Sequence, residues 1–509
     1  MFLRLAALTA LALAPSQAMA AWYEAKTNHF IIYSQQKPDV LRDYAEKLER
    51  YDSGVRAVRQ MKDIPPTSTS RVTLYVVRDA RMVEDVLGAP GSGVAGVYFG
   101  RASGPVSIAS GEPKRNKWDL DGRTVVFHEY LHHLMLQDAT AAYPTWMTEG
   151  YAEFFAPAEM RPDGSVEFGE PPDYRGAELR YLRGMSLPEM LGGIYNQTTG
   201  EEWISQYSRG WLLAHYLAFE PSRRGQASKY VELIQKGVPA LDAAKQAFGN
   251  LGQLDKELNK YHARDTLPTR IIPASMIKVG PVAIRPLNPD EDAVVPLRVK
   301  LEGRSSDVAT ARSVAGAARS AAERFPTSPI VMETLAQAEL QAKRYAEASA
   351  AADKAIALEP KAFKALVYKG RAELELAKQN PKSANWTTVR SWFSKANRID
   401  TNAPEPLMYY YQTFVDQGST PPAQAVDGLL FALDLVPQDD QLRLSAVRQL
   451  LRENDAVDAK ATFAPIAYDP HSGKTKRRNL EIMGKITGGD AQGALQMLDE
   501  DEKKRKKEG

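Results

Sequence analysis

From Ser305 onward the sequence becomes helical and repetitive, and this change divides the chain into two unlike parts. Between Pro329 and Pro360, small or apolar residues recur at the spacing expected for two short helices, at Leu335, Ala336, Tyr345, Ala348 and Ala355. Alanines at these positions let two antiparallel helices approach closely, and the final proline cannot continue the second helix. The pattern therefore predicts a stack of helix pairs, in which each pair packs against the next.

The offsets match the tetratricopeptide repeat pattern, whose period is about 34 residues. Weaker copies follow, at Gly370 and Ala396 and then at Ala425, Ala432, Pro437 and Pro470. A plain helical bundle is the alternative interpretation. We assign residues 305–498 to tetratricopeptide-like repeats and residues 499–509 to a solvated, charged tail. Since repeats contact mainly their sequence neighbours, we expect this region to fold without the rest of the chain.

Residues 1–20 have the form of a secretory signal peptide. Arg4 provides a positive charge, the apolar stretch LAALTALALA is too short to span a bilayer, and Ala18-Met19-Ala20 has the small residues of a cleavage site. Cleavage after Ala20 predicts a periplasmic or secreted protein with no membrane span in the mature chain. Because the chain has no cysteine, a disulfide, a thiolate ligand and a lipidated cysteine are excluded.

The composition is that of a soluble globular protein. Hydrophobic residues make up 44% and charged residues 25% of the chain, which excludes a disordered, collagen-like or polytopic membrane protein. The 65 Lys and Arg residues nearly balance the 63 Asp and Glu residues, leaving a net charge of +2. A near-neutral chain has no electrostatic reason to bind nucleic acid, so no nucleic-acid partner is predicted.

Residues 21–267 mix strands and helices. The pattern predicts strands at 30–33 and 71–77, a long amphipathic helix at 40–61 between them, and a hairpin or edge strand at 96–109. Helices dominate from Thr124 onward. Residues 268–304, rich in proline and charge, are predicted to be a linker or small packing segment. The expected fold class is α+β, with a small mixed sheet and a helical subdomain, followed by an all-α solenoid.

A cluster of histidines marks the candidate site. The chain has only seven histidines, and three of them are His128, His132 and His133. The first two, with Glu129 between them, form an H-E-x-x-H motif in an apolar helical context. At i and i+4 both imidazoles project from one helix face and can bind one Zn²⁺, while Glu129 can reach a metal-bound water as general base. A buried helix with hydrogen-bonded histidines is the alternative, and His133 receives no role.

A second helix offers the third ligand. The segment that begins at Pro144 carries Glu149 and Glu153 at i and i+4, and 16 residues separate Glu149 from His132, which is enough for a turn back. We therefore predict Glu149 as the third ligand. Glu153 could accept a hydrogen bond from the far nitrogen of a ligand histidine, which would fix its tautomer. A surface carboxylate is the alternative for Glu153.

The combination resembles the gluzincin metallopeptidases of the thermolysin and aminopeptidase N type, and most closely the peptidase-MA-like proteins that carry tetratricopeptide repeats. In that family H-E-x-x-H precedes a helix with the motif W-x-x-E-G-x-A, matched here by Trp146, Glu149, Gly150 and Ala152. The resemblance implies that Glu149 is a zinc ligand. It covers about 250 residues, but only three short motifs are specific.

The third motif is Tyr207-Ser208-Arg209-Gly210, which is similar to the Y-x-K-G element of the aminopeptidase branch. By resemblance, Tyr207 stabilises the tetrahedral intermediate. Tyr207 also shares a helix face with Trp211 and His215, so a packing role is the alternative, and His215 is the next candidate donor. Arg209 replaces the usual lysine and no G-x-M-E-N segment occurs, so exopeptidase action is unsupported.

The sequence predicts an exported, zinc-dependent peptide-bond hydrolase. Zn²⁺ would bind to His128, His132 and Glu149, with Glu129 as the base and Tyr207 as the oxyanion donor. The substrate would be a peptide or protein, and the repeats would bind substrate or a protein partner. The alternative is a catalytically inactive metallopeptidase-fold scaffold for envelope proteins, against which the filled catalytic positions argue. Ester hydrolysis at the same site is a lesser option.

Overall fold

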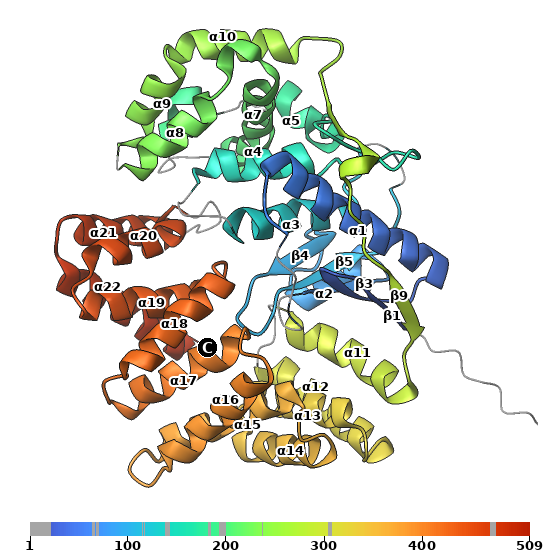
Figure 1. Ribbon diagram of the computed structural model, residues 1–509, viewed down its shortest axis with the longest axis vertical. Helices are drawn as coiled ribbons and strands as arrows, with labels where there is room; N and C mark the ends of the chain where they lie inside the picture. Colours follow the sequence, from blue (N-terminus) through green and yellow to red (C-terminus); the bar gives the residue numbers. More distant parts are fainter. Residues whose placement is uncertain are drawn as a thin grey trace, which may run out of the picture.

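A computed structural model (Figure 1) describes residues 22–63, 67, 71–114, 116, 118–137, 143–181, 185–192, 200–236, 238–303, 308–468 and 475–508. The predicted signal peptide and the repeat position Pro470 lie outside the described residues. The described part combines a mixed sheet with many helices, which confirms the α+β class at this level. None of its helices is long and apolar enough to cross a membrane.

A six-stranded sheet forms the centre of the N-terminal part, in the order β4-β5-β3-β2-β1-β9. Strands β2, β3 and β5 are parallel, whereas β4, β1 and β9 run antiparallel to their neighbours. The strands are β1 (Tyr23–Lys26), β2 (Phe30–Ser34), β3 (Val72–Val77), β4 (Gly96–Phe99), β5 (Val106–Ser110) and β9 (Ala283–Pro286). The strands and the hairpin expected from the sequence are all present.

Helices cover both faces of this sheet, namely α1 (Pro38–Arg59) and α3 (Gly122–Gln137) on one face and α2 (Ala80–Leu87) and α11 (Pro289–Glu302) on the other. Ile32 and Leu74 pack toward α1 and α3. Their neighbours Tyr33 and Tyr75 stack on each other and pack toward α2 and α11. Because successive strand residues point to opposite faces, a sheet covered on both sides needs apolar residues at consecutive positions.

The remaining N-terminal helices form a second layer beyond α3 (Figure 1). They are α4 (Thr145–Phe155), α5 (Gly176–Tyr181), α6 (Leu187–Gly192), α7 (Gly200–Phe219), α8 (Gln226–Gln235), α9 (Ala240–Phe248) and α10 (Leu251–His262), with the short helices η1 (Asp173–Arg175) and η2 (Pro221–Arg223). A third short helix, η3 (Ala274–Met276), contacts α1 instead. A small antiparallel sheet comprises β6 (Glu159–Met160), β7 (Val166–Phe168) and β8 (Arg270–Ile272).

Helices α4 and α7 meet backbone to backbone at two glycines. A β-carbon on Gly150 would lie 2.3 Å from the carbonyl oxygen of Gly210, and one on Gly210 would lie 2.7 Å from the carbonyl oxygen of Trp146. No side chain fits at either position without separating the helices. This close approach brings α7 next to the helix that carries Glu149.

Helices α11 to α22 form an array in which each helix packs on the next one in the chain (Figure 1). After α11 they are α12 (Val308–Arg324), α13 (Pro329–Gln341), α14 (Tyr345–Leu358), α15 (Phe363–Gln379), α16 (Trp386–Ile399), α17 (Pro404–Gln417), α18 (Ala423–Leu435), α19 (Asp440–Arg452), α20 (Ala456–Ala467), α21 (Lys476–Thr487) and α22 (Ala491–Glu508). The predicted small residues Ala336, Ala348 and Ala355 are fully buried between these helices. Helical repeats are therefore confirmed in the described part.

The segment expected to link the two parts belongs to both of them. Residues 268–304 supply β8 and β9 to the N-terminal sheets and α11 to the array. Val295 and Val299 of α11 pack under the sheet, while Leu301 belongs to the core between α12 and α13. The array thus shares its first helix with the sheet, so a fragment that folds alone has to retain α11.

Charged residues at the end of the chain also join a folded element. Residues 499–508 continue α22, since Glu, Lys and Arg favour helix. Asp499 and Glu502 each lie 3.2 Å from the guanidinium of Arg448 on α19.

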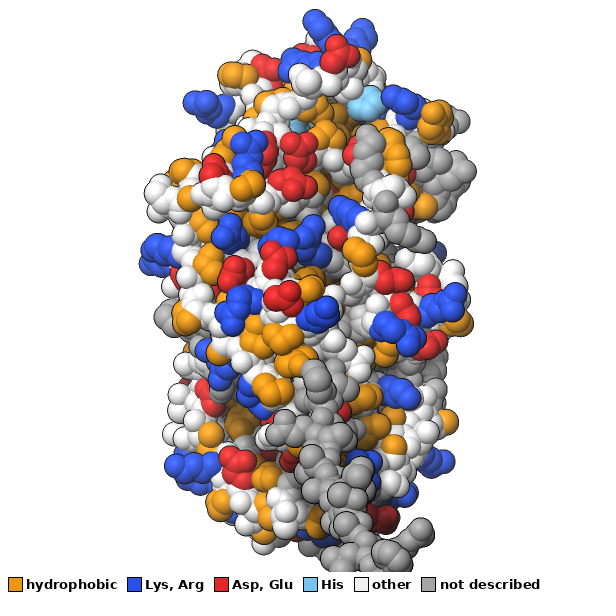
Figure 2. Space-filling model, turned by 90° about the vertical axis from the view of Figure 1, so that its right-hand side faces the viewer, with side chains coloured by type: hydrophobic (Ala, Val, Ile, Leu, Met, Phe, Trp, Pro, Cys, Tyr) orange, Lys and Arg blue, Asp and Glu red, His pale blue; other side chains and the backbone are white. Residues whose placement is uncertain are grey.

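On the part of the face that Figure 2 shows and the structure describes, Lys and Arg side chains are interspersed with Asp and Glu. That face carries no patch of a single charge sign.

Candidate metal centre

Helix α3 places His128 and His132 side by side. Their Nε2 atoms are 3.2 Å apart, and their ring centroids are separated by 4.8 Å with the rings nearly perpendicular. The i, i+4 spacing produces this pairing because residues four apart share one helix face. Both side chains are largely buried, with 13% and 14% of their surface exposed.

Glu149 approaches both histidines from α4. Its Oε2 lies 3.3 Å from His128 Nε2, and its Oε1 lies 3.7 Å from His132 Nε2. One donor atom from each of the three residues falls within 4.8 Å of the others. Two atoms bound at about 2.05 Å to a tetrahedral zinc lie about 3.3 Å apart. The two Nε2 atoms and the contact between His128 and Glu149 are close to this separation, and each histidine has its own nearest oxygen of Glu149, so the donor set fits a zinc ion.

Negative charge surrounds the two histidines. Burial lowers the pKa of His128, but its contact with Glu149 and the charges of Glu153 and Glu129 outweigh this effect, so its pKa is raised. Buried carboxylates around two imidazoles favour a cation at their centre. Glu129 lies beside His128 on α3 and remains partly exposed.

Glu153 lies one turn beyond Glu149 and faces the other side of the His128 ring. Its Oε1 is 3.5 Å from His128 Nδ1, which is an ion-pair distance. The hydroxyl of Tyr174 donates to Oε2 at 2.7 Å, and the guanidinium of Arg175 donates to Oε1 at 2.8 Å. The buried carboxylate is therefore held in place behind His128, on the side away from Glu149, which is where a residue that orients a ligand histidine would lie.

Tyr207 reaches the centre from α7. Its ring centroid lies 6.2 Å from that of His128, and the Arg175 guanidinium lies 4.7 Å above the Tyr207 ring. Burial and the charge of Glu149 raise the pKa of the Tyr207 hydroxyl, so it stays a proton donor at neutral pH.

His215, the next candidate donor, is committed elsewhere. It is fully buried, its Nε2 donates to the Gly169 carbonyl at 2.9 Å, and its Nδ1 accepts from the Tyr261 hydroxyl at 2.9 Å. Burial lowers the pKa of His215 to about 4, so the ring is neutral at physiological pH. These two hydrogen bonds connect α7 to the Gly169 backbone and to α10. His215 therefore has a packing role in this structure and not the role of oxyanion donor suggested for it above.

No family model matches the chain, and no curated protein is similar to it in sequence. Among solved structures, the chain is similar to a thermophilic tetratricopeptide-repeat protein of Thermus thermophilus, with 15% identity and a TM-score of 0.30. That likeness covers 34% of this chain and 91% of the other. A likeness of this degree has no bearing on function.

His133, which received no role from the sequence, points away from the two ligands. It is 5% exposed, and its ring stacks on Tyr130. The single lone pair of its Nδ1 faces two donors, the Tyr98 hydroxyl at 2.7 Å and the Gln438 amide nitrogen at 2.9 Å. Gln438 belongs to the helical array, so the ligand-bearing helix touches a residue 305 positions away in the chain.

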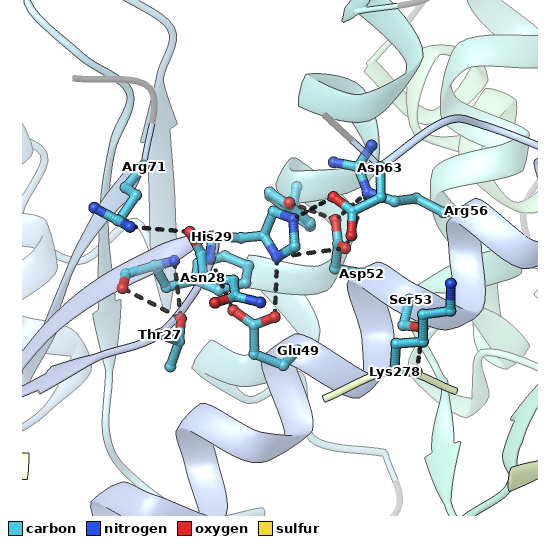
Figure 3. Close-up of polar contacts among 12 residues, drawn as sticks. Thr27, Asn28, His29, Glu49, Asp52, Ser53, Arg56, Asp63, Arg71 and Lys278 are labelled. Carbon is cyan, nitrogen blue, oxygen red and sulfur yellow. Dashed lines mark hydrogen bonds and ion pairs between the residues drawn. The ribbon is translucent and has the colours of Figure 1, made fainter. Parts of the chain in front are cut away.

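A second cluster of histidine and carboxylates lies between the sheet and α1 (Figure 3). His29 precedes β2, and its Nδ1 is 2.9 Å from Glu49 while its Nε2 is 3.1 Å from Asp63. Burial lowers the pKa of His29, but the hydrogen bond with Glu49 and the charge of Asp52 outweigh it and raise the pKa to about 9. The ring is therefore protonated at neutral pH.

Asp52 extends this cluster to the ligand-bearing helix. Its carboxylate accepts from the Arg56 guanidinium at 2.8 Å and from the Tyr130 hydroxyl at 2.8 Å. Because Tyr130 belongs to α3, this cluster ties α3 to α1. Sequence reasoning missed it, because the i, i+4 spacing marks the pair of Asp52 and Arg56 but no spacing marks their contacts with His29 and Tyr130.

Proposed function

We propose that this chain is a zinc-dependent peptide-bond hydrolase, an exported metallopeptidase of the gluzincin type. The convergence of His128 Nε2, His132 Nε2 and the Glu149 carboxylate carries the proposal, because one donor atom from each residue lies within 4.8 Å of the others, as binding to a single ion requires. The family motifs at these residues support the same assignment.

The surrounding side chains have the properties that hydrolysis requires. Zinc held by the three ligands would supply Lewis acidity toward a water molecule and a carbonyl oxygen. Glu129 accepts the proton of the attacking water and returns it to the leaving amine. Tyr207 donates a hydrogen bond to the oxygen on which charge develops. Glu153 and Arg175 orient His128 and the Tyr207 ring from behind.

The decisive experiment compares wild type with Glu129→Gln on a denatured protein substrate. Since Glu129 is not a ligand, the variant should keep its zinc while turnover falls by about 10²–10⁴-fold, the contribution of a general base. Glu46→Gln, which changes a partly exposed carboxylate of α1, is the matched control. A Glu129→Gln variant with wild-type turnover would remove the proposal.

The same experiment separates the scaffold alternative, which predicts a folded, zinc-loaded wild type without turnover. A peptide or protein substrate is part of the proposal, and the resemblance of the motifs to metallopeptidases supports it. Binding of a protein partner to the array and export to the periplasm or medium remain predictions. Sequencing the N-terminus of the exported chain would test cleavage after Ala20.

A further inference from the structure

We propose that the helical array is part of the metal centre, and that Gln438 is a positioning residue that holds α3 through His133. The inference deepens the proposed function and rests on it, since it concerns the placement of the ligand His132. It predicts that the array acts on the chemical step and does more than bind partners.

The contact is built from side chains of both parts of the chain. Gln438 lies between α18 and α19, and its Nε2 is 2.9 Å from His133 Nδ1 and 3.4 Å from the Tyr98 hydroxyl. An amide nitrogen can only donate, so His133 Nδ1 is the acceptor. Tyr98 donates to the same nitrogen at 2.7 Å. The one lone pair of His133 Nδ1 is thus shared, in a three-centre hydrogen bond, between a donor from the β4 edge and a donor from the array.

The array also holds the tip of the β4–β5 hairpin, residues 100–104. The Asp439 carboxylate accepts from the Ala102 amide at 2.6 Å, and the Lys364 ammonium donates to the Ser103 carbonyl at 2.6 Å. Arg101 pairs with Glu302 of α11 at 3.2 Å. The Ala102 amide and the Ser103 carbonyl thus both bind to side chains of the array. These backbone hydrogen bonds fix the position of the tip, as they do for a peptide bound in a groove.

The hairpin tip is closely packed against Gln438, and a cavity lies beside it. A β-carbon on Gly100 would lie 2.2 Å from Gln438 Cγ, so glycine is needed for the approach. Beside the tip, a cavity of about 870 Å³ separates the sheet from the array and is lined by Tyr75, Arg298 and Tyr368 among others. One side of the hairpin borders this cavity, so on that side the hairpin is held by its contacts with the array.

A change at Gln438 affects the candidate ligands through contacts within α3 and between α3 and β4. His133 is adjacent to His132 on α3, and α3 also packs along β4, which carries Tyr98. The distances to Glu149 on α4 depend on where α3 lies. Displacing a reacting group by about 1 Å costs up to about 10²-fold in rate, and losing a partner behind a ligand costs about 10–100-fold.

The test uses two full-length variants that break the contact from opposite sides. Gln438→Leu removes the donor at similar size, and Gly100→Ala pushes the hairpin away from Gln438. The matched control is Gln412→Leu, since the Gln412 amide donates to Asp416 on its own helix, α17. For each protein, kcat, KM, melting temperature and the visible spectrum of the Co²⁺-loaded form are measured.

We expect both variants to lose about tenfold in kcat with KM unchanged, and to show an altered Co²⁺ spectrum, while Gln412→Leu behaves as wild type. The proposal is overturned if both variants keep the wild-type kcat and spectrum, or if turnover rises, which would mean that the hairpin inhibits. It is also overturned if the loss only follows the fraction unfolded. A wild type that binds Co²⁺ without cleaving peptide would refute the proposed function instead, and the spectra would still decide the placement of α3.

Discussion

Two buried clusters of histidine and carboxylate lie on either side of α3, and they differ in how their polar atoms are arranged. Around His29, each ring nitrogen has its own carboxylate, at 2.9 Å and 3.1 Å, and Asp52 is matched by Arg56 (Figure 3). At the candidate metal centre, two Nε2 atoms face each other across 3.2 Å, with one carboxylate between them.

The two clusters differ in whether their donor atoms point at a single position. In the His29 cluster the donors and acceptors form a chain of pairs, and the positive charge comes from Arg56 and the protonated ring itself. At the candidate metal centre one donor atom from each of His128, His132 and Glu149 lies close to the others, and the nearest described arginine, Arg175, pairs with Glu153 behind them. Proximity of histidine and carboxylate alone therefore does not indicate a metal site, whereas convergence on a single point does.

The sharpest test of this contrast removes one glutamate from each cluster. Glu149→Ala should weaken zinc binding by more than about 100-fold and abolish turnover, because a two-histidine site remains. Glu49→Ala should lower the melting temperature yet keep one zinc per folded chain. Metal analysis of the folded fractions decides it. Equal zinc in Glu149→Ala and wild type would remove Glu149 from the ligand set.

The next effect concerns Tyr207, which lies against both His128 and Arg175. Tyr207→Phe keeps the ring and its packing but removes the hydroxyl donor. We expect kcat to fall by about 10²–10³-fold, the loss typical of one oxyanion donor, with KM, zinc content and melting temperature nearly unchanged. Steady-state kinetics on a peptide substrate measures this. Wild-type turnover in the variant would leave Tyr207 as a packing residue.

A smaller loss should follow from Glu153, which stands behind a ligand. Glu153→Gln removes the charge that faces His128 Nδ1 and leaves Arg175 paired with Glu178 alone. We expect zinc affinity to fall by about 10–100-fold, measured by competition with a chelator. Glu159→Gln, an exposed carboxylate of β6, is the control. Unchanged affinity in Glu153→Gln would show that the carboxylate serves only to bind Arg175.

Local patterns predicted most of the elements and the core of the site. The i, i+4 histidines and the glutamate-bearing helix could be recognised because helix periodicity decides which side chains share a face. The central strands, the hairpin and the repeat helices could be placed for the same reason, since each depends on residues close in sequence.

What could not be predicted depends on contacts between distant residues. Arg175 reaches Glu153 from a short helix 22 residues later, and Gln438 reaches His133 across 305 residues. Neither carries a periodic signal. The role of residues 268–304 was underestimated because proline and charge are typical of linkers, whereas pairing with β1 and β7 makes β9 and β8 parts of sheets. Tertiary pairing, and not local propensity, decided that segment.

The last prediction has the smallest effect on the metal centre and concerns the His29 cluster alone. The folded chain holds the His29 proton up to a pKa of about 9, whereas an unfolded histidine releases it near 6.5. Between these values the unfolded state binds fewer protons, so the free energy of unfolding decreases as the pH rises. The stabilisation is complete below about pH 6.5 and is lost through pH 9, and it amounts to at most about 3 kcal/mol.

Urea unfolding of wild type and His29→Gln at pH 6 and pH 9, at equal zinc, measures the difference. Titrating groups that do not interact with His29, such as His128, are common to both proteins and cancel, so the measured difference belongs to His29 together with its partners Glu49 and Asp52. Replacing the exposed His262 by Gln serves as control and should leave the wild-type pH dependence intact. An equal stability gap between His29→Gln and wild type at both pH values would mean that His29 is neutral in the folded chain, and that the two clusters are more alike than their hydrogen bonds indicate.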